Sequence, residues 1–432
     1  MPTYTSLPGF RDFYPADFAV RAHITSTWRE TARRYGFEEY DGPPLEALEL
    51  YTDKSGEEIV GQLYNFTDKG GREVALRPEM TPTLARMVGA RAGGLRKPIR
   101  WFSVPQLFRY ERTQRGRLRE HFQWNVDLVG ESDSAADAEV LAVALDGLRA
   151  LGLTEEHIVA RYNDRRLLER LLLEIGVAEA NLPRAYNAVD KLGRDPDERI
   201  RERLRTEAGL DNAAIDRVFS VFRAGSLAAL AHEFGGVEGI EAEIERITQF
   251  QQRLETMGFG AYVAYDASIV RGLAYYTGIV FEIFDRRGEL RAICGGGRYD
   301  RLLGAVSGAD LPAVGFGMGD VVLTELLRDL DLLPDTAPAV DVYLVAVSEN
   351  EQPTLLRAAR ALRGSGHSVI YALRSTSVGK QFKDADARGA RRVVVLGPDE
   401  VAAGVAVVRT MGTGGEERVP LDVILSGRLE AG

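Results

Sequence analysis

The stretch RGLAYYTGIVFEIF, residues 271–284, combines one cation, two adjacent tyrosines and one acid with apolar or small residues. From residue 274 onward it alternates as a strand does, with Tyr276, Glu282 and Phe284 on one face. Arg271 stands at the mouth of this predicted strand. A solvated arginine on an ordinary sheet strand would explain the pattern, and so would an anion-binding arginine beside a pocket for something small and polar.

Two further segments place polar side chains on one face of a predicted strand. In FRYER (108–112) the period of two puts Arg109 and Glu111 on the same side. HFQWNVDLVG (121–130) alternates in the same way, and its polar positions are Gln123, Asn125 and Asp127. A buried polar face needs partners, so these segments indicate a binding site.

Two glycine- and proline-marked stretches complete the set of candidates. LRPEMTPTLAR (76–86) places Glu79 and Thr81 near a proline-marked helix start. In CGGGRYD (294–300) the glycines permit close backbone approach, and we expect Arg298 and Tyr299 to supply contacts. This stretch does not satisfy G-x-G-x-x-G, and no G-x-x-x-x-G-K-[ST] loop occurs, so a bound nucleotide would use neither device.

Composition limits the classes of protein. The 432 residues, 45% of them hydrophobic and 27% charged, allow two or three globular domains. Cys294 is the single cysteine, which excludes intrachain disulfides and cysteine-based zinc sites, and the five histidines lack metal-ligand spacing. With no apolar run near about 18 residues and no signal-like start, we expect a cytoplasmic protein without a membrane segment.

Charge is distributed unevenly. The net charge is −10, which argues against a general coating of nucleic acid. Residues 91–119 nevertheless hold nine lysines and arginines against the single acid Glu111. We expect this segment to bind phosphates locally, although a solvated basic loop is the alternative.

The order of elements predicts a mixed fold. Residues 16–35 have helical spacing, and 99–111 with 121–130 read as an antiparallel hairpin joined by a basic loop. Residues 151–258 read as a helical, charge-rich insertion. The prolines in LRDLDLLPDTAPAVD (327–341) indicate a linker. Beyond it, short apolar strands alternate with helices, which predicts a small α/β domain with a mostly parallel sheet.

In this order and spacing, the stretches resemble the histidyl-tRNA synthetases, a family of class II aminoacyl-tRNA synthetases. RGLAYYTG and GGGRYD are similar to the two histidine-specific signatures of that family, and GFRDFYP (9–15) and SVGKQFKDADARGARRVVVLG (377–397) extend the resemblance over nearly the whole chain. The resemblance implies an α+β catalytic core with an antiparallel sheet and surrounding helices, a helical insertion, and a C-terminal α/β anticodon-binding domain. We expect the core at 1–325, the linker at 326–340 and the last domain at 341–432.

The resemblance also implies roles for individual residues. The catalytic arginines would be Arg109 and Arg271, on opposite sides of the α-phosphate. ATP would contact Arg109, Glu111, Arg117 and His121, the last in place of the phenylalanine that usually stacks on adenine. Histidine would contact Glu79, Thr81, Gln123, Asp127, Arg271, Tyr275, Tyr276 and Tyr299.

The implied activity is that of a histidine–tRNA ligase, which joins histidine to AMP at the expense of ATP and passes it to the 3′ end of tRNA(His). Mg²⁺ would accompany ATP without assignable ligands, and there would be no permanent cofactor. The resemblance implies a homodimer. The alternative is a non-enzymatic paralogue, either the regulatory subunit of an ATP phosphoribosyltransferase or a sensor of amino acids or tRNA.

One segment departs from the family pattern. Class II enzymes usually carry an arginine where a glycine-rich strand leads into a helix, and this chain has Val321 and Val322 at that point. The next cation is Arg328, nearly two turns on, so no nearby cation replaces the missing one. We expect an active enzyme that holds the outer end of ATP more loosely.

Overall fold

The computed structural model describes residues 4–52, 61–192, 195–269, 276–335 and 340–429. The chain forms two compact units, one of residues 1–12 and 20–334 and the other of residues 13–19 and 335–432. The division between Pro334 and Asp335 lies inside the expected linker. Within the described residues, no helix combines the length and apolarity needed to cross a membrane.

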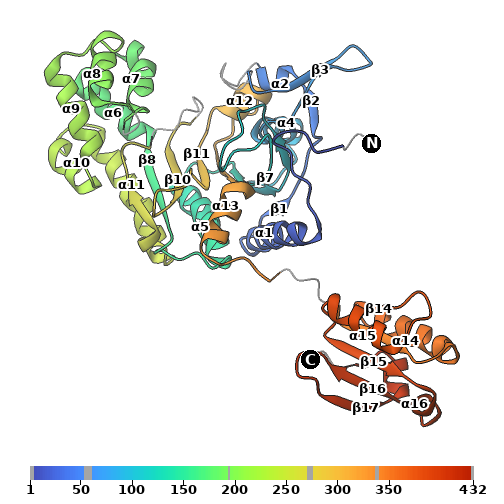
Figure 1. Ribbon diagram of the computed structural model, residues 1–432. Coiled ribbons are helices and arrows are strands. Elements are labelled where there is room, and N and C mark those ends of the chain that lie inside the picture. Colours follow the sequence, from blue (N-terminus) through green and yellow to red (C-terminus); the bar gives the residue numbers. More distant parts are fainter. Residues whose placement is uncertain (1–3, 53–60, 193–194, 270–275, 336–339, 430–432) are drawn as a thin grey trace. The chain divides into compact units, whose positions relative to one another are not determined.

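A large, mainly antiparallel sheet organises the first unit (Figure 1). In spatial order its strands are β1 (Glu38–Glu39), β5 (Ile99–Ser103), β7 (Glu120–Val129), β12 (Ala313–Gly319), β11 (Cys294–Arg298), β10 (Ile279–Asp285), β8 (Ile158–Asp164) and β9 (Val263–Tyr265), and β6 (Gln106–Phe108) pairs with β7. The pairings β1–β5 and β8–β9 are parallel and the others antiparallel. The expected antiparallel core is therefore confirmed.

The apolar face of this sheet forms the main core. The helices α1 (Pro15–Arg34) and α5 (Ser134–Ala150) pack against it. Trp28 of α1 stacks on Trp124 of β7 with 5.9 Å between ring centroids, and Trp124 meets Phe316 of β12 edge-on at 5.1 Å. Gly147 of α5 makes room for this stack, because a Cβ there would lie 2.5 Å from the Trp124 ring. The even-numbered residues of β7 thus point to the core, as the alternation predicts.

Short elements near the start of the chain extend the core. A three-stranded sheet contains β2 (Leu45–Ala47), β4 (Glu73–Leu76) and β3 (Tyr64–Thr67) in that order, followed by α4 (Thr81–Arg91). Other short helices are α2 (Glu49–Thr52), α12 (Leu302–Ser307) and α13 (Asp320–Asp329). Gly89 of α4 lets α12 approach closely, because a Cβ there would clash with Ser307.

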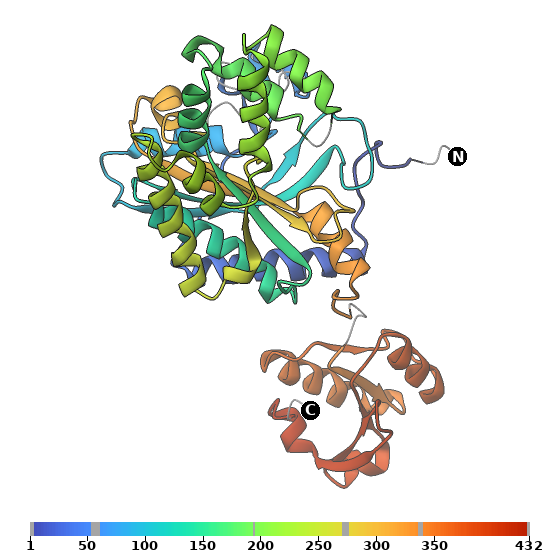
Figure 2. The same ribbon diagram turned by 90° about the vertical axis from the view of Figure 1, so that its left-hand side faces the viewer.

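The helical insertion begins later than predicted. Residues 158–164 form β8, a strand of the central sheet, and the helices follow it. They are α6 (Arg165–Ile175), η1 (Glu179–Asn181), α7 (Leu182–Val189), α8 (Asp197–Thr206), α9 (Asn212–Arg223), α10 (Leu227–Phe234) and α11 (Ile240–Thr256), with η2 (Gly260–Tyr262) before β9. Figures 1 and 2 show α6 to α10 in green and α11 in yellow-green, gathered beside β8 at one end of the sheet.

The second unit is a small α/β domain. Its sheet has the order β14 (Val369–Tyr371), β13 (Val342–Ala346), β15 (Arg392–Leu396), β16 (Val405–Thr410), β17 (Glu416–Pro420). Its helices are η3 (Glu349–Glu351), α14 (Gln352–Gly364), α15 (Val378–Ala387), α16 (Pro398–Ala402) and α17 (Leu421–Leu425). The prediction of a mostly parallel sheet is wrong for the second half of the domain. There β15 and β16 pair antiparallel, and so do β16 and β17, which are joined by a tight turn through Gly414 at φ 72°.

Candidate functional site

The register of the central sheet places the polar residues of β7 opposite glycines. Asp127 pairs with Gly315 of β12, and Gln123 with Gly319. Gly315 in turn pairs with Gly297 of β11. Residues paired across strands point to the same side of a sheet, so this face carries polar side chains on β7 beside a strip of glycines.

The glycines leave the space that these side chains occupy. A Cβ at Gly315 would lie 2.1 Å from Oδ1 of Asp127, and one at Gly317 would lie within 2.9 Å of the Gln123 amide. A Cβ at Gly319 would meet only the His121 ring, at 3.9 Å. Two glycines of β12, Gly315 and Gly317, are therefore needed because the side chains of β7 approach the β12 backbone closely there.

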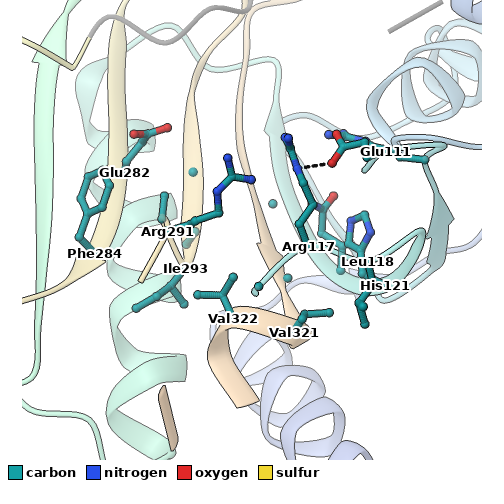
Figure 3. A pocket seen from close by; sticks show the side chains of 18 residues that line it. Glu111, Arg117, Leu118, His121, Glu282, Phe284, Arg291, Ile293, Val321 and Val322 are labelled. Carbon is teal, nitrogen blue, oxygen red and sulfur yellow. Dashed lines mark ion pairs between the residues drawn. The ribbon is translucent and has the colours of Figure 1, made fainter. Parts of the chain in front are cut away.

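A pocket of about 660 Å³ opens over one end of this face (Figure 3). Its walls come from the loop after β6, from β7, from the β10–β11 hairpin and from the start of α13. Predicted site residues that line it are Arg109, Glu111, Arg117, His121 and Gln123. The structure thus brings the residues expected at ATP into one cavity.

Backbone contacts position Arg109. The predicted strand 99–111 breaks at Val104 and Pro105, and β6 ends at Phe108, so Arg109 and Glu111 lie beyond it. The Arg109 amide still donates to the Arg119 carbonyl at 3.0 Å, which keeps the two segments together. Arg109 Nε donates to the Pro78 carbonyl at 2.9 Å and so joins the pocket to the segment before α4.

The basic loop 112–119 is attached to the protein at several points. Arg115 forms ion pairs with Glu325 and Asp329 of α13, at 3.1 and 2.9 Å, and the Gly116 amide donates to Glu325 at 3.1 Å. Arg117 forms an ion pair with the buried carboxylate of Glu111. Ion pairs therefore hold the loop at two of its arginines, although the Arg115 side chain is still 61% exposed.

His121 is neutral in this pocket. Burial, followed by the charges of Arg109 and Arg11, lowers the pKa of its imidazole to about 3. A neutral ring can stack on a base without repelling the arginines around it.

A second, buried cluster lies further along the same face. The Tyr299 hydroxyl donates to Oδ1 of Asp127, and both side chains are less than 5% exposed. Burial raises the pKa of Asp127 to about 7, and the hydrogen bond from Tyr299 opposes that rise. Tyr276 and Tyr299 pack in one apolar cluster with Leu84 and Val88 of α4. This cluster can recognise a small group that exchanges hydrogen bonds with a carboxyl and a phenol.

The remaining predicted residues are distributed as follows. Glu79 is buried directly after Pro78, and Thr81 is the first residue of α4. Neither lines the 660 Å³ pocket. Arg271 and Tyr275 lie outside the described residues.

Arg298 is not part of the site. It was expected to supply contacts beside Tyr299, but adjacent strand residues point to opposite faces. Its guanidinium is 1% exposed and binds Asp137 of α5, with 3.1 Å from Nε to each carboxylate oxygen. This buried ion pair fixes β11 on α5.

Three lining residues were not singled out for the ATP end of the site. Glu282 and Phe284 share a face of β10, and Arg291 stands in the hairpin before β11. The alternation of 274–284 predicted the shared face, whereas nothing periodic points to Arg291. Val321 and Val322 of α13 line the same pocket. Arg291, which is distant from those valines in the sequence, lines the pocket together with them.

Comparisons with known proteins agree with this geometry. Residues 9–320 match the family described as histidyl-tRNA synthetase, and residues 341–427 match the anticodon binding domain. A histidine–tRNA ligase of Opitutus terrae is 45% identical over 98% of each chain. A crystal structure of histidyl-tRNA synthetase from a Nostoc species has a TM-score of 0.84 at 24% identity, covering 99% of this chain and 100% of that one. A Bacillus halodurans structure titled as an ATP phosphoribosyltransferase regulatory subunit/histidyl-tRNA synthetase has a TM-score of 0.76 at 24% identity, covering 92% and 99%. The two structural likenesses show the fold alone.

Proposed function

Because the chain belongs to the histidyl-tRNA synthetase family and is an ATP-dependent histidine–tRNA ligase, we propose that the glycine-lined sheet face is where it forms histidyl-adenylate. The arrangement that supports this proposal is the buried Asp127–Tyr299 pair on the same face as the arginine-lined pocket. The chain is 45% identical to a histidine–tRNA ligase over 98% of its length, and this similarity favours the enzyme over a non-enzymatic paralogue.

The chemistry needs fixed positive charge rather than a base. A carboxylate oxygen of histidine attacks the α-phosphorus of ATP. A bond forms between this oxygen and the phosphorus, and the bond from the phosphorus to the pyrophosphate oxygen breaks. Charge develops on the equatorial phosphate oxygens, so preorganised cations lower the barrier. Arg109 fits this role at the α-phosphate because the Pro78 carbonyl orients its guanidinium. Arg271, which lies outside the described residues, would act from the other side.

The other ATP contacts follow from the pocket. The neutral ring of His121 would stack on adenine, Glu111 would accept from the adenine amino group, and Arg117 would bind the terminal phosphates. Arg117 and Glu111 form an ion pair with each other, so ATP has to share or separate it.

Histidine would be recognised in the buried cluster. An imidazole offers one N–H donor and one acceptor, which a carboxyl and a phenol can satisfy together. Asp127 and Tyr276 would bind the imidazole, with Tyr275 and Tyr299 lining its pocket. Glu79, Thr81 and Gln123 would bind the α-amino group. A side chain that lacks these groups would leave the buried Asp127 carboxyl with Tyr299 alone and without its second hydrogen bond, which is how such sites reject analogues.

Mg²⁺ would enter with ATP. Within the described ranges no group of three or more histidines, cysteines or acids could hold a metal ion. Mg²⁺ commonly needs only one or two protein carboxylates besides phosphate oxygens and water, and Glu282 in the pocket wall fits such a ligand. When bound, the ion would neutralise charge on the phosphates.

We also propose that the α/β domain of residues 341–432 binds the anticodon arm of tRNA(His) through a basic surface. Its candidate residues are Arg374, Lys380, Lys383, Arg388, Arg391 and Arg392. Two of them already have acidic neighbours, since Arg388 pairs with Asp384 and Arg391 with Asp341. We propose further that the protein forms a homodimer through the segment YGFEEYDGPPLE (35–46). Its proposed location is the cytoplasm.

Two assays in sequence test the function. The protein should exchange pyrophosphate into ATP only when histidine is present, and it should then charge tRNA(His). Removal of residues 338–432 should preserve the exchange and abolish charging, because adenylation is proposed to reside in residues 1–325. Absence of histidine-dependent exchange at saturating ATP would refute the function, and loss of exchange in a folded truncated protein would refute the division of labour.

A further inference from the structure

The start of α13 contributes no charge to the pocket. Val321 and Val322 line it there, and Val322 packs close to the basic loop, since a Cβ at Gly116 would lie 3.2 Å from its Cγ2. Bound ATP brings several negative charges, most of them on its outer phosphates. A site for ATP therefore needs cations from some other element at this end.

The charged side chains that line the pocket differ in whether they have hydrogen-bond or ion-pair partners. Among the described lining residues the arginines are Arg109, Arg117 and Arg291 and the acids Glu111 and Glu282. Arg117 is paired with Glu111, and Arg109 is held by the Pro78 carbonyl. In the described part of the chain, Arg291 has neither a hydrogen-bond partner nor an ion-pair partner.

The β10–β11 hairpin brings Arg291 to the pocket. Ile283 of β10 pairs with Cys294 of β11, and the Ile293 amide donates to the Ile283 carbonyl at 2.8 Å. This pairing fixes residue 291 just beyond the strand end, while its side chain stays exposed. Figure 3 shows the Arg291 guanidinium between the strand that carries Glu282 and Phe284 and the loop that carries Arg117, with Val322 below it.

We propose that Arg291 binds the outer phosphates of ATP and supplies the positive charge that α13 lacks. The inference rests on the proposed adenylation site. Arg109 is held by the carbonyl of Pro78, the residue before Glu79, which is proposed to bind histidine, so Arg109 is assigned to the reacting phosphorus. Arg291 faces Arg117 across the open part of the pocket, and its planar fork can serve two phosphate oxygens at once.

The test compares Arg291→Gln with Arg287→Gln. Arg287 lies in the same hairpin and is exposed, but it does not line the pocket, so it controls for loss of one charge from this loop. Histidine-dependent exchange is measured against the concentrations of ATP, pyrophosphate and histidine, and AMP is added as a competitor of ATP. Arg291→Lys shows whether a point charge suffices or the planar fork is needed.

We expect Arg291→Gln to raise the KM for ATP and for pyrophosphate about tenfold, the usual effect of losing one charge-assisted contact. The kcat should stay within about twofold, because the contact is made in both the ground state and the transition state. Competition by AMP, which has no outer phosphates, should not change, and Arg287→Gln should match the parent.

Unchanged KM values in Arg291→Gln would overturn the inference, and so would equal effects of the two substitutions. If AMP competed more weakly while the KM for pyrophosphate stayed unchanged, Arg291 would belong to the nucleoside end of the site. That result would also overturn the inference. In all these cases the parent protein still exchanges pyrophosphate, so the proposed function stands. An inactive parent would refute the function instead.

Discussion

The two ends of the site share one sheet face but differ in how they hold polar groups. Around Asp127 the carboxyl and the Tyr299 hydroxyl are buried, hydrogen-bonded to each other and enclosed by apolar side chains. Around Arg291 the pocket is open, and its charges lie on loops and strand ends. The first end is built for selection by hydrogen bonding, and the second for attraction by charge.

This difference has consequences for substitutions. A buried polar group that loses its partner carries the full cost of desolvation, whereas an exposed ion pair is worth little because water and salt replace it. Changes near Asp127 should therefore be specific for histidine and large, and changes at the rim should be graded and act on ATP. The following substitutions test this contrast, beginning with the arginine proposed at the reacting phosphorus.

Arg109→Ala should have the largest effect. Arg109 lines the pocket and is positioned by the Pro78 carbonyl, and it is proposed to act where charge develops on the α-phosphate. The rate constant of exchange at saturating substrates should fall about 10²- to 10³-fold, as for loss of one preorganised donor. Arg112→Ala is the matched control, because Arg112 is an exposed arginine of the same segment that does not line the pocket. Equal losses in both variants would contradict the role of Arg109.

Asp127→Asn should change how stability depends on pH. Burial raises the pKa of Asp127 from its ordinary value to about 7, so between about pH 4 and pH 7 the unfolded chain releases a proton that the folded protein keeps. The parent therefore loses stability over this window as the pH rises, and Asp127→Asn does not. The free energy of unfolding of the variant, relative to the parent, should rise by about 2 kcal/mol between pH 5 and pH 7.

Denaturant unfolding at several pH values measures this difference. Tyr299→Phe provides the matched control, because loss of the hydroxyl raises the pKa of Asp127 further and should extend the window upward. A difference between Asp127→Asn and the parent that does not depend on pH would show that Asp127 is ionised throughout.

Gly315→Ala should impair the use of histidine while sparing ATP. The new Cβ would lie 2.1 Å from Oδ1 of Asp127 and would force the carboxylate to move. We expect the KM for histidine to rise about tenfold or more, the scale of one lost hydrogen bond to a charged or buried partner. Gly319→Ala, on the same strand and face, meets only His121 at 3.9 Å and should leave the KM for histidine unchanged. If both variants raised the KM for histidine alike, the glycine strip would serve the fold rather than the site.

Arg115→Gln should have the smallest effect. It removes the ion pairs from the basic loop to Glu325 and Asp329, but the Arg115 side chain is 61% exposed and the Gly116 amide keeps its hydrogen bond to Glu325. The KM for ATP should rise less than about threefold, and added salt should reduce the difference from the parent. A larger rise that persists in high salt would mean that these ion pairs hold the open end in place.

Strand alternation was the most informative pattern in the sequence. The period of two in 121–130 predicted β7 and its two faces, because side chains alternate across any strand whatever surrounds it. The same reasoning placed Glu282 and Phe284 together on β10. It fails for 99–111, where Pro105 interrupts the strand, and it does not reveal β8, a short strand at the start of a charge-rich helical segment.

The sequence by itself determined which side chains share a face where strands alternate clearly, as in 121–130 and 274–284, since this depends on local backbone geometry. The tertiary structure alone decided which faces meet. Sheet register placed the glycines of β12 against Asp127 and Gln123, and α5 supplied the buried partner of Arg298. Arg291 shows the limit most clearly, because a loop residue has no periodic signal. It reaches the pocket only because β10 pairs with β11 and the hairpin loop lies beside α13, an interaction between segments that no local pattern encodes.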